Sequence, residues 1–260
     1  PLSIAMKTRV ETDKTKNEDF GNALIFPFAG HDTTANTLTW LIYELCKNSV
    51  AFKKLQAEVD NFWIEHEDNN IIEYEDLKKL KYMTRCIAET LRLWTPIPLG
   101  TSRELIDDAY ITGKNGQKVK IPKGTFIQVP NWTRHRNPKL WGEDVNSFNP
   151  DRDFVDEEIY NDMGLASFNP NSPRFSPFTF GPRDCIGKNF SQIEMRIILL
   201  HLLKNFTFTL PKKQLNTYNQ DTISINLQTL GPRNIYNENL YQKKLGMYVN
   251  VIERHTESKL

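Results

Sequence analysis

Hydrophobic residues return every three or four positions through the first part of the chain, a spacing typical of amphipathic helices. Between Glu18 and Lys47 this pattern is continuous, so we predict one long helix there, with Asn17 or Asp19 as its N-terminal cap. Pro27 lies in the middle of that helix. Because a proline lacks the backbone N–H and clashes with the preceding turn, we expect the helix to be distorted at that point.

The pattern predicts three more helices and then a change of structure. An amphipathic helix covers residues 52–63, a short acidic helix precedes Leu80, and a third helix runs from Tyr82 to Trp94. Beyond it, short apolar segments bounded by Gly or Pro predict strands at 109–112, 118–121 and 125–129. Residues 132–178 show little periodicity, as is typical of a long functional connection.

The last third of the chain again mixes both patterns. Residues 187–204 predict a helix. Its apolar stripe is predicted to consist of Phe190, Ile193, Ile197 and Leu200. Alternating apolar residues predict strands at 206–210, 223–227 and 247–251. The fold class that follows is mainly α with small β-sheets, and residues 1–17 form a polar lead-in to it.

Composition narrows the classes of function. The chain has 260 residues, of which 39% are hydrophobic and 11% aromatic, enough to build a core. Its net charge of +1 gives no reason to expect a nucleic-acid partner, because domains that bind nucleic acids are usually strongly basic. No run of about 18 apolar residues predicts a membrane span, and no signal peptide opens the chain. The chain begins with Pro1, so we expect it to be a fragment.

The residues with the clearest chemistry surround one of the three cysteines. Cys46, Cys86 and Cys185 lie too far apart for a disulfide framework or for Cys-x-x-Cys zinc spacing, and they favour a reducing compartment. Cys185 lies between Gly181 and Gly187, directly before a predicted helix whose N-terminus favours a thiolate that can ligate a metal. An inert buried cysteine is an equally good interpretation of that loop alone.

The positions around Cys185 resemble a known signature. Phe178, Gly181, Arg183, Cys185 and Gly187 follow the pattern Phe-x-x-Gly-x-Arg-x-Cys-x-Gly, which is typical of the cytochrome P450 family of haem-thiolate monooxygenases. With three further motifs in the family's order, the resemblance covers residues 18 to about 251. It implies that residues 18–260 are the C-terminal part of a single cytochrome P450 domain whose N-terminal half is absent. It also implies haem b (iron protoporphyrin IX) as cofactor, with Cys185 as the ligand of its iron.

Residues 29–34, Ala-Gly-His-Asp-Thr-Thr, resemble the family's oxygen-binding helix motif. The resemblance implies that Ala29 and Gly30 lie against the haem face, that Asp32 and Thr33 deliver protons, and that His31 is directed away. Glycine permits a close approach, and a threonine hydroxyl can bond a helix carbonyl or a ligand. Without the resemblance, the same residues also fit an ordinary polar helix face.

Two further motifs concern the scaffold. Glu89 and Arg92 match the family's Glu-x-x-Arg, and residues 148–154 resemble its Phe-x-Pro-Glu-Arg-Phe segment, with Asp for Glu and one extra Asp. The resemblance implies that Glu89, Arg92 and Arg152 form a buried cluster that fixes the loop under the haem. For Glu89 and Arg92 alone, an exposed pair on one helix face is the alternative.

Other residues are assigned to haem and substrate by the same resemblance. Arg103 and Arg183 match arginines that pair with haem propionates, a role suited to the guanidinium fork, although a solvated surface position is the alternative for Arg103. Phe178, Gly181 and Gly187 complete the expected haem contacts. The substrate pocket is expected at residues 97–100, Phe28, Ala29 and the tip after Leu227. Lys188, Lys204, Lys212 and Lys213 are either a basic docking face for an electron donor or ordinary solvated surface.

The function implied is insertion of one oxygen atom of dioxygen into a small organic substrate. Electrons are expected from NADPH through NADPH–cytochrome P450 reductase, at the cytoplasmic face of the endoplasmic reticulum membrane, with membrane association only through the missing N-terminus. The Asn- and Lys-rich composition and the residues around Cys185 suggest a fungal source and N-formyltyrosine as a possible substrate.

Two alternatives stay open. One is a haem-thiolate isomerase or dehydratase, against which the Asp32–Thr33 pair argues, and the other is a non-catalytic truncated remnant. We expect this chain alone to be inactive, because apolar faces of its first helix, such as those of Leu24, Phe28 and Leu41, lack their partners.

Overall fold

The computed structural model describes residues 13–66, 71–159, 172, 174–179, 182–211 and 249–254. Its first element, α2, runs from Asp13 to Lys47 as the single long helix that the pattern predicted. Because the helix already begins at Asp13, the prediction of a cap at Asn17 or Asp19 is wrong. The helix continues through Pro27 without a break. The neighbouring residues are exposed, so water can bond the carbonyl that the missing N–H leaves free.

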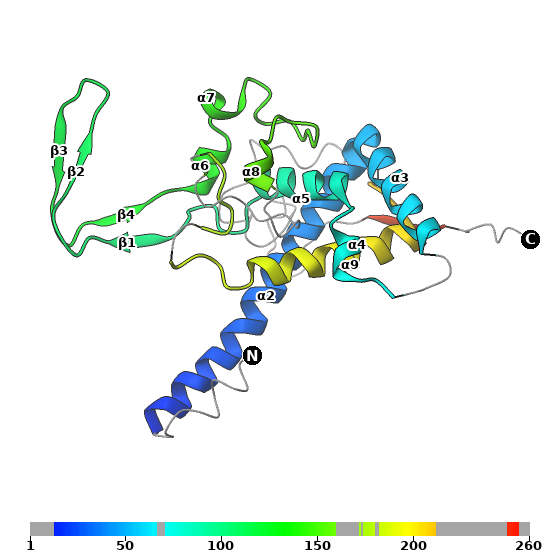
Figure 1. The fold of residues 1–260 in the computed structure, drawn as a ribbon, viewed down its shortest axis with the longest axis horizontal. Coiled ribbons are helices and arrows are strands. Elements are labelled where there is room, and N and C mark those ends of the chain that lie inside the picture. The colour runs from blue at the N-terminus through cyan, green and yellow to red at the C-terminus, as the bar shows by residue number, and fades with distance from the viewer. Residues whose placement is uncertain are drawn as a thin grey trace, which may run out of the picture.

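Residues 17–31 of α2 are largely exposed on the part of the helix that projects from the rest of the described chain, whereas the second half of the helix is largely buried (Figure 1). Leu24 and Phe28 are 59% and 67% exposed, as expected for apolar residues without a partner. Leu41 is fully buried, so the expectation was wrong for that residue. It is covered because the second half of α2 packs against α3 (Ser49–Glu65), α5 (Lys81–Leu93) and α9 (Lys188–Asn205).

The predicted helices that follow α2 are all present. α3 is capped by Asn48, whose side chain accepts a hydrogen bond from the N–H of Ala51, and α4 (Tyr74–Leu77) is the short acidic helix. α5 is the central helix, and every residue from Cys86 to Leu93 is buried because α2 and α3 both pack on it. Charged residues on α5 must therefore find their partners inside the protein.

Four short strands form the extended arm that projects from the helices in Figure 1. β2 (Ala109–Thr112) and β3 (Lys118–Ile121) were predicted with these bounds, and they pair antiparallel. β4 (Phe126–Gln128) was also predicted, but its antiparallel partner β1 (Ser102–Glu104) was missed. All three residues of β1 are exposed, so the sequence shows no alternation of apolar and polar residues there. They form a strand only because they pair with β4.

The segment without periodicity contains three short helices: α6 (Asn131–His135), α7 (Pro138–Trp141) and α8 (Asp156–Ile159). Each has only four or five residues, too few to show a helical repeat in the sequence. α7 is set by local signals, because Pro138 occupies its first turn and the Asn137 side chain accepts a hydrogen bond from the Lys139 N–H.

The C-terminal part consists of α9 followed by β5 (Phe206–Thr209), which pairs antiparallel with β6 (Asn250–Glu253). β5 falls within the strand predicted at 206–210, and β6 overlaps the strand predicted at 247–251 only at residues 250–251. The strand predicted at 223–227 lies outside the described residues. Within the described part of the chain, no helix is both long and apolar enough to cross a membrane.

The predicted apolar stripe of α9 is partly wrong. Phe190 and Ile197 are 66% and 37% exposed, whereas Gln192 and Arg196 are fully buried. The Arg196 guanidinium donates hydrogen bonds to Gln192 Oε1 at 3.0 Å and to Thr84 Oγ1 at 2.8 Å. Because Gln192 Oε1 and Thr84 Oγ1 both accept from Arg196, these polar side chains can face the core, which a hydrophobic pattern does not detect.

Candidate functional site

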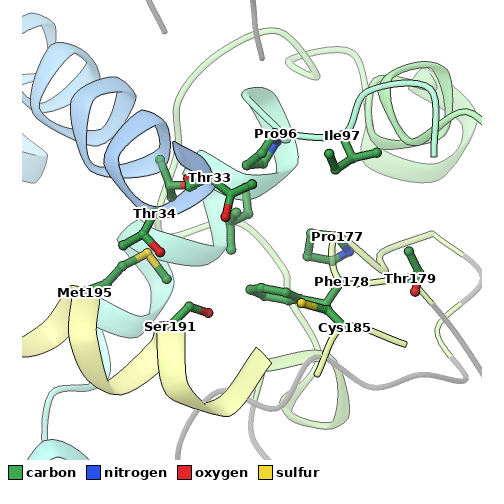
Figure 2. A pocket seen from close by; sticks show the side chains of 12 residues that line it. Thr33, Thr34, Pro96, Ile97, Pro177, Phe178, Thr179, Cys185, Ser191 and Met195 are labelled. Carbon is green, nitrogen blue, oxygen red and sulfur yellow. The ribbon is translucent and has the colours of Figure 1, made fainter. Parts of the chain in front are cut away.

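One cavity of about 100 Å³ lies between the middle of α2 and the loop that precedes α9. α2 forms one wall, Cys185 and Phe178 lie on the opposite wall, and α9 closes a third side (Figure 2). Its lining is mostly apolar. The lining residues are Thr33, Thr34, Thr37, Leu91, Pro96, Ile97, Pro177, Phe178, Thr179, Cys185, Ser191 and Met195.

Cys185 is the exposed one of the three cysteines, so the alternative of an inert buried thiol does not hold for it. Its backbone N–H donates to the Phe178 carbonyl at 3.0 Å, and its own carbonyl accepts from the Lys188 N–H at 3.2 Å. These two bonds join the cysteine to the loop on one side and to the first turn of α9 on the other. A Cβ at Gly187 would lie 3.8 Å from Cys185 Sγ. Because glycine has no side chain, that side of the sulfur stays uncovered.

The other two cysteines have environments that suppress their reactivity. Cys86 is fully buried, and burial raises the pKa of its thiol well above the usual range. Burial likewise raises the pKa of Cys46 to about 11. Cys185 is therefore the cysteine of this chain that a ligand or reagent can reach.

The wall opposite Cys185 carries three threonines of α2. The Thr33 hydroxyl donates to the Ala29 carbonyl at 2.7 Å, and the Thr37 hydroxyl donates to the Thr33 carbonyl at 2.8 Å. The sequence analysis gave the threonine hydroxyl two possible partners, a helix carbonyl or a ligand, and the structure shows the bond to a helix carbonyl. Thr34 is 5% exposed and its hydroxyl has no partner within the described residues.

The remaining predicted residues of α2 do not line this cavity. Ala29, Gly30 and His31 are exposed, and Asp32 is half-buried. A Cβ at Gly30 would meet nothing within 4 Å, so the space over this turn is open to a bulky group. Phe28, expected in the substrate pocket, is 67% exposed and lies outside the cavity lining.

The predicted propionate partners also lie apart from the cavity lining. Arg103 is exposed on β1 and donates to the carbonyl of Ser102 at 3.0 Å, and Arg183 is exposed on the loop before Cys185. Gly181 lies outside the described residues, as do Lys212, Lys213 and the tip after Leu227. Of the segment 97–100, Ile97 lines the cavity.

Several lining residues were missed by the sequence analysis. Leu91 projects from α5, Pro96 follows that helix, and Ser191 and Met195 lie one turn apart on α9. The sequence could have indicated that Ser191 and Met195 lie together, because residues four apart on a helix share a face. The face that contains Ser191 and Met195 was passed over in favour of the more hydrophobic Phe190 and Ile197.

The loop that carries Phe178 is anchored to α6. The Ser176 N–H donates to Nε2 of buried His135 at 3.4 Å, and Arg134 Nη2 donates to Ser176 Oγ at 2.5 Å. Burial, together with the nearby cations of Arg134, Arg92 and Arg136, lowers the pKa of His135 well below its usual value. A neutral His135 can accept the Ser176 N–H at Nε2. This bond holds the backbone directly before Pro177 and Phe178, which line the cavity.

The three charged residues predicted as scaffold form a buried cluster. The Glu89 carboxylate accepts from Arg92 at 2.7 and 2.8 Å, and from Arg152 Nε at 3.2 Å. The side chains of Glu89 and Arg92 are fully buried and Arg152 is 4% exposed, so an exposed pair is excluded. Asp144, which the sequence analysis did not identify, accepts two further hydrogen bonds from Arg152.

These residues fit the haem group that the resemblance implies. A reachable thiol lies on one wall, hydroxyls lie on the opposite wall, the lining between them is apolar, and the turn at Gly30 has open space. The cavity volume of about 100 Å³ is smaller than the roughly 300–1,000 Å³ of most ligand pockets, so a haem would extend beyond these walls. Among the described residues, no three His, Cys, Asp or Glu side chains gather into a metal-binding group.

Comparison with known proteins supplies a family. The family model described as Cytochrome P450 matches residues 3–233. The putative cytochrome P450 CYP13A5 of Caenorhabditis elegans is 34% identical over 200 residues, which is 77% of this chain and 35% of that protein. The putative cytochrome P450 CYP13A4 of the same organism is 32% identical over 239 residues, covering 90% of this chain and 41% of that protein.

A relative from a second organism shows a similar degree of likeness. Cytochrome P450 52-N1 of Starmerella bombicola is 33% identical over 211 residues, covering 78% of this chain and 38% of that protein. The chain thus spans between 35% and 41% of the length of these curated relatives.

Proposed function

The chain belongs to the cytochrome P450 family, and from that premise we propose that the full-length protein is a haem-thiolate monooxygenase. By full-length protein we mean a chain of its relatives' length that includes these 260 residues. The observation that carries the proposal is the placement of Cys185 and Thr33 on opposite walls of one cavity. A thiolate ligand facing a hydroxyl-bearing helix is the arrangement that the proposed chemistry needs.

The roles proposed for individual residues come from the resemblance to the family. Cys185 would ligate the haem iron, and a thiolate-ligated haem supplies the centre at which dioxygen is activated. Phe178, Gly181 and Gly187 would lie on the cysteine side, while Ala29 and Gly30 would face the opposite side. Arg103 and Arg183 are the proposed partners of the propionates, which suits their exposed guanidinium groups.

Proton delivery is assigned to Asp32 and Thr33. Asp32 is half-buried on α2, and the next residue, Thr33, lines the cavity. In this proposal the Asp32 carboxylate takes up the proton and the Thr33 hydroxyl presents it to the cavity. Thr33 Oγ1 now donates to the Ala29 carbonyl, and its lone pairs remain free to accept. Delivery from Thr33 therefore requires that this bond to Ala29 be exchanged.

The partners and the substrate are finer parts of the proposal. We propose that electrons come from NADPH through NADPH–cytochrome P450 reductase, that the protein acts at the endoplasmic reticulum membrane of a fungus, and that N-formyltyrosine is the first substrate to test. The choice of source and substrate rests on composition and on the residues around Cys185.

The ligand assignment is tested with Cys185→His in the full-length protein. We expect this change to abolish the red-shifted Soret band that a thiolate gives the ferrous–carbon monoxide complex. Cys46→Ser and Cys86→Ser are the matched controls, because neither residue lines the cavity, and both should keep the band. A thiolate band that persists in Cys185→His would refute the proposal.

Use of dioxygen separates a monooxygenase from a haem-thiolate isomerase or dehydratase. With purified reductase, NADPH and ¹⁸O-labelled dioxygen, a monooxygenase should transfer one labelled atom to the product. Product that forms without dioxygen and without NADPH would assign the site to the isomerase class instead.

A further inference from the structure

The turn that joins β2 to β3 contains the one asparagine of this chain that is followed by glycine, Asn115–Gly116. It lies at the tip of the arm, away from the helices (Figure 1). Every residue from Ile111 to Lys120 is exposed, so water reaches this turn. Gly116 has a φ of +75°, and a Cβ there would meet nothing within 4 Å. No side chain therefore shields the backbone nitrogen of Gly116 on that side.

The side-chain carbonyl of Asn115 is held within the same turn. Its oxygen Oδ1 accepts a hydrogen bond from the N–H of Gln117 at 3.2 Å. The ring that this bond closes contains the backbone nitrogen of Gly116, so the carbonyl and that nitrogen belong to one local structure. An N–H bonded to a carbonyl oxygen also stabilises the negative charge that develops there when a nucleophile attacks the carbon.

We propose that Asn115 is a site of spontaneous covalent modification, at which the backbone nitrogen of Gly116 displaces the side-chain amide as ammonia. The Gly116 nitrogen gives its proton to water and forms a bond to Cγ of Asn115. The bond from Cγ to Nδ2 then breaks, and Nδ2 takes up a proton from water and leaves as ammonia. Water opens the resulting cyclic imide at either carbonyl, so position 115 becomes aspartate or isoaspartate. No electrons are gained or lost.

One hydrogen bond must open before the nitrogen can react. The Gly116 N–H donates to the Gly113 carbonyl at 2.9 Å. Among the described residues, β2 and β3 pair only with each other, and an isolated two-stranded hairpin is marginally stable. The bond at Gly116 can therefore open locally while the helices stay folded.

Two other asparagines are controls within the same chain. Oδ1 of Asn137 and Oδ1 of Asn149 each accept from the N–H two residues later, at 3.0 and 3.1 Å, as Oδ1 of Asn115 does. Both are followed by proline, whose nitrogen has no proton to lose and is already fully substituted. Their carbonyls are held in the same way but lack the nucleophile, so Asn137 and Asn149 should stay unmodified.

The modification would change both the charge and the main chain of the arm. Either product carries a carboxylate, next to Lys114, where Asn115 has a neutral amide. Isoaspartate also inserts an extra carbon into the main chain between the bonded residues Gly113 and Gln117, whose N–H and carbonyl lie 2.9 Å apart and close the hairpin. We expect this bond to be lost, and with it the pairing of β2 and β3 next to the turn.

The test follows the full-length protein during prolonged incubation at mildly alkaline pH, with circular dichroism to verify that it stays folded. Digestion at acidic pH, where ring closure is suppressed, is followed by mass spectrometry of the peptides. The peptide with Asn115 should gain the mass difference between an amide and a carboxyl group, and electron-transfer fragmentation should identify isoaspartate in it. The peptides with Asn137 and Asn149 should not change.

A substitution isolates the ring closure. Asn115→Gln keeps an exposed amide in the turn but would have to close a larger ring, so the gain in mass at this position should disappear. Asn115→Asp supplies the reference peptide that distinguishes aspartate from isoaspartate.

The possible results decide the proposal without reference to haem. Aspartate at position 115 without any isoaspartate would mean that water attacks directly, and it would overturn the role of Gly116. An unchanged mass at Asn115, or equal gains at Asn115, Asn137 and Asn149, would overturn the proposal as a whole. None of these measurements requires bound haem, so this inference and the proposed function stand or fall separately.

Discussion

The Glu89 carboxylate accepts a hydrogen bond from Arg152 Nε at 3.2 Å, although the two residues are 63 positions apart in the sequence. Both side chains are buried, and the same carboxylate also holds Arg92. This cluster connects the central helix α5 with the segment that follows α7. That segment leads on to the loop that carries Cys185.

Removing the shared carboxylate should be strongly destabilising. Glu89→Gln keeps the shape of the side chain but leaves two buried guanidinium groups facing a neutral amide. Breaking a buried ion pair by removing one partner costs about 3–5 kcal/mol, because the remaining charge is desolvated without compensation. Urea unfolding of the full-length protein should show a loss of this size in the free energy of unfolding.

The control for this measurement is Asp151→Asn, which breaks the exposed pair of Lys54 and Asp151. Their side chains are 49% and 55% exposed, so the expected loss is about 0–1 kcal/mol. Equal losses for Glu89→Gln and Asp151→Asn would contradict the view that burial of the cluster determines its contribution.

His135 should make the folded protein sensitive to mild acid. Burial and the neighbouring arginine cations lower the pKa of its imidazole well below the usual 6.5, so the folded state keeps it neutral. The unfolded chain takes up that proton below about pH 6.5 and therefore binds more protons than the folded one. Stability should then fall as the pH drops below about 6.5, with a slope of at most about 1.4 kcal/mol per pH unit from this group.

Replacing the imidazole tests this assignment. His135→Gln places an amide oxygen where Nε2 accepts from the Ser176 N–H, and it cannot be protonated in this range. The free energy of unfolding, measured from pH 7 to pH 5, should depend less steeply on pH in the variant. An unchanged slope would mean that another group causes the acid sensitivity.

The three cysteines should differ sharply in their reaction with a thiol reagent. In the haem-free full-length protein at pH 8, iodoacetamide should modify Cys185, which is exposed. The pKa of Cys46 is raised to about 11, so roughly 0.1% of it is thiolate at that pH, and fully buried Cys86 is inaccessible. Peptide mass spectrometry measures each site separately.

Haem loading provides the second half of the same experiment. If Cys185 ligates the iron, its modification should be suppressed in the haem-loaded protein while Cys46 and Cys86 stay unmodified as before. Modification of Cys185 at the same rate in both forms would contradict its assignment as the ligand.

Sequence alone determined the elements with a repeating or punctuated pattern. α2, α3 and α5 have the long apolar repeats of amphipathic helices, and the strands β2 and β3 are bounded by glycine or proline, so their existence could be read directly. The chemistry at Cys185 was also visible, because its motif is local and contiguous. The grouping of Glu89, Arg92 and Arg152 came instead from the resemblance to the family, because Glu89 and Arg152 are 63 positions apart in the sequence.

Only the tertiary structure decided which residues meet. The strand β1 exists because β4 pairs with it, and Gln192 and Arg196 face the core because their polar groups bond each other and Thr84. Leu41 is buried because three helices cover its part of α2. The cavity is formed by segments far apart in the sequence, so its lining, including the unpartnered hydroxyl of Thr34, depends on long-range packing. A local pattern records the preference of one segment, whereas burial and hydrogen-bond satisfaction depend on every segment that packs against it.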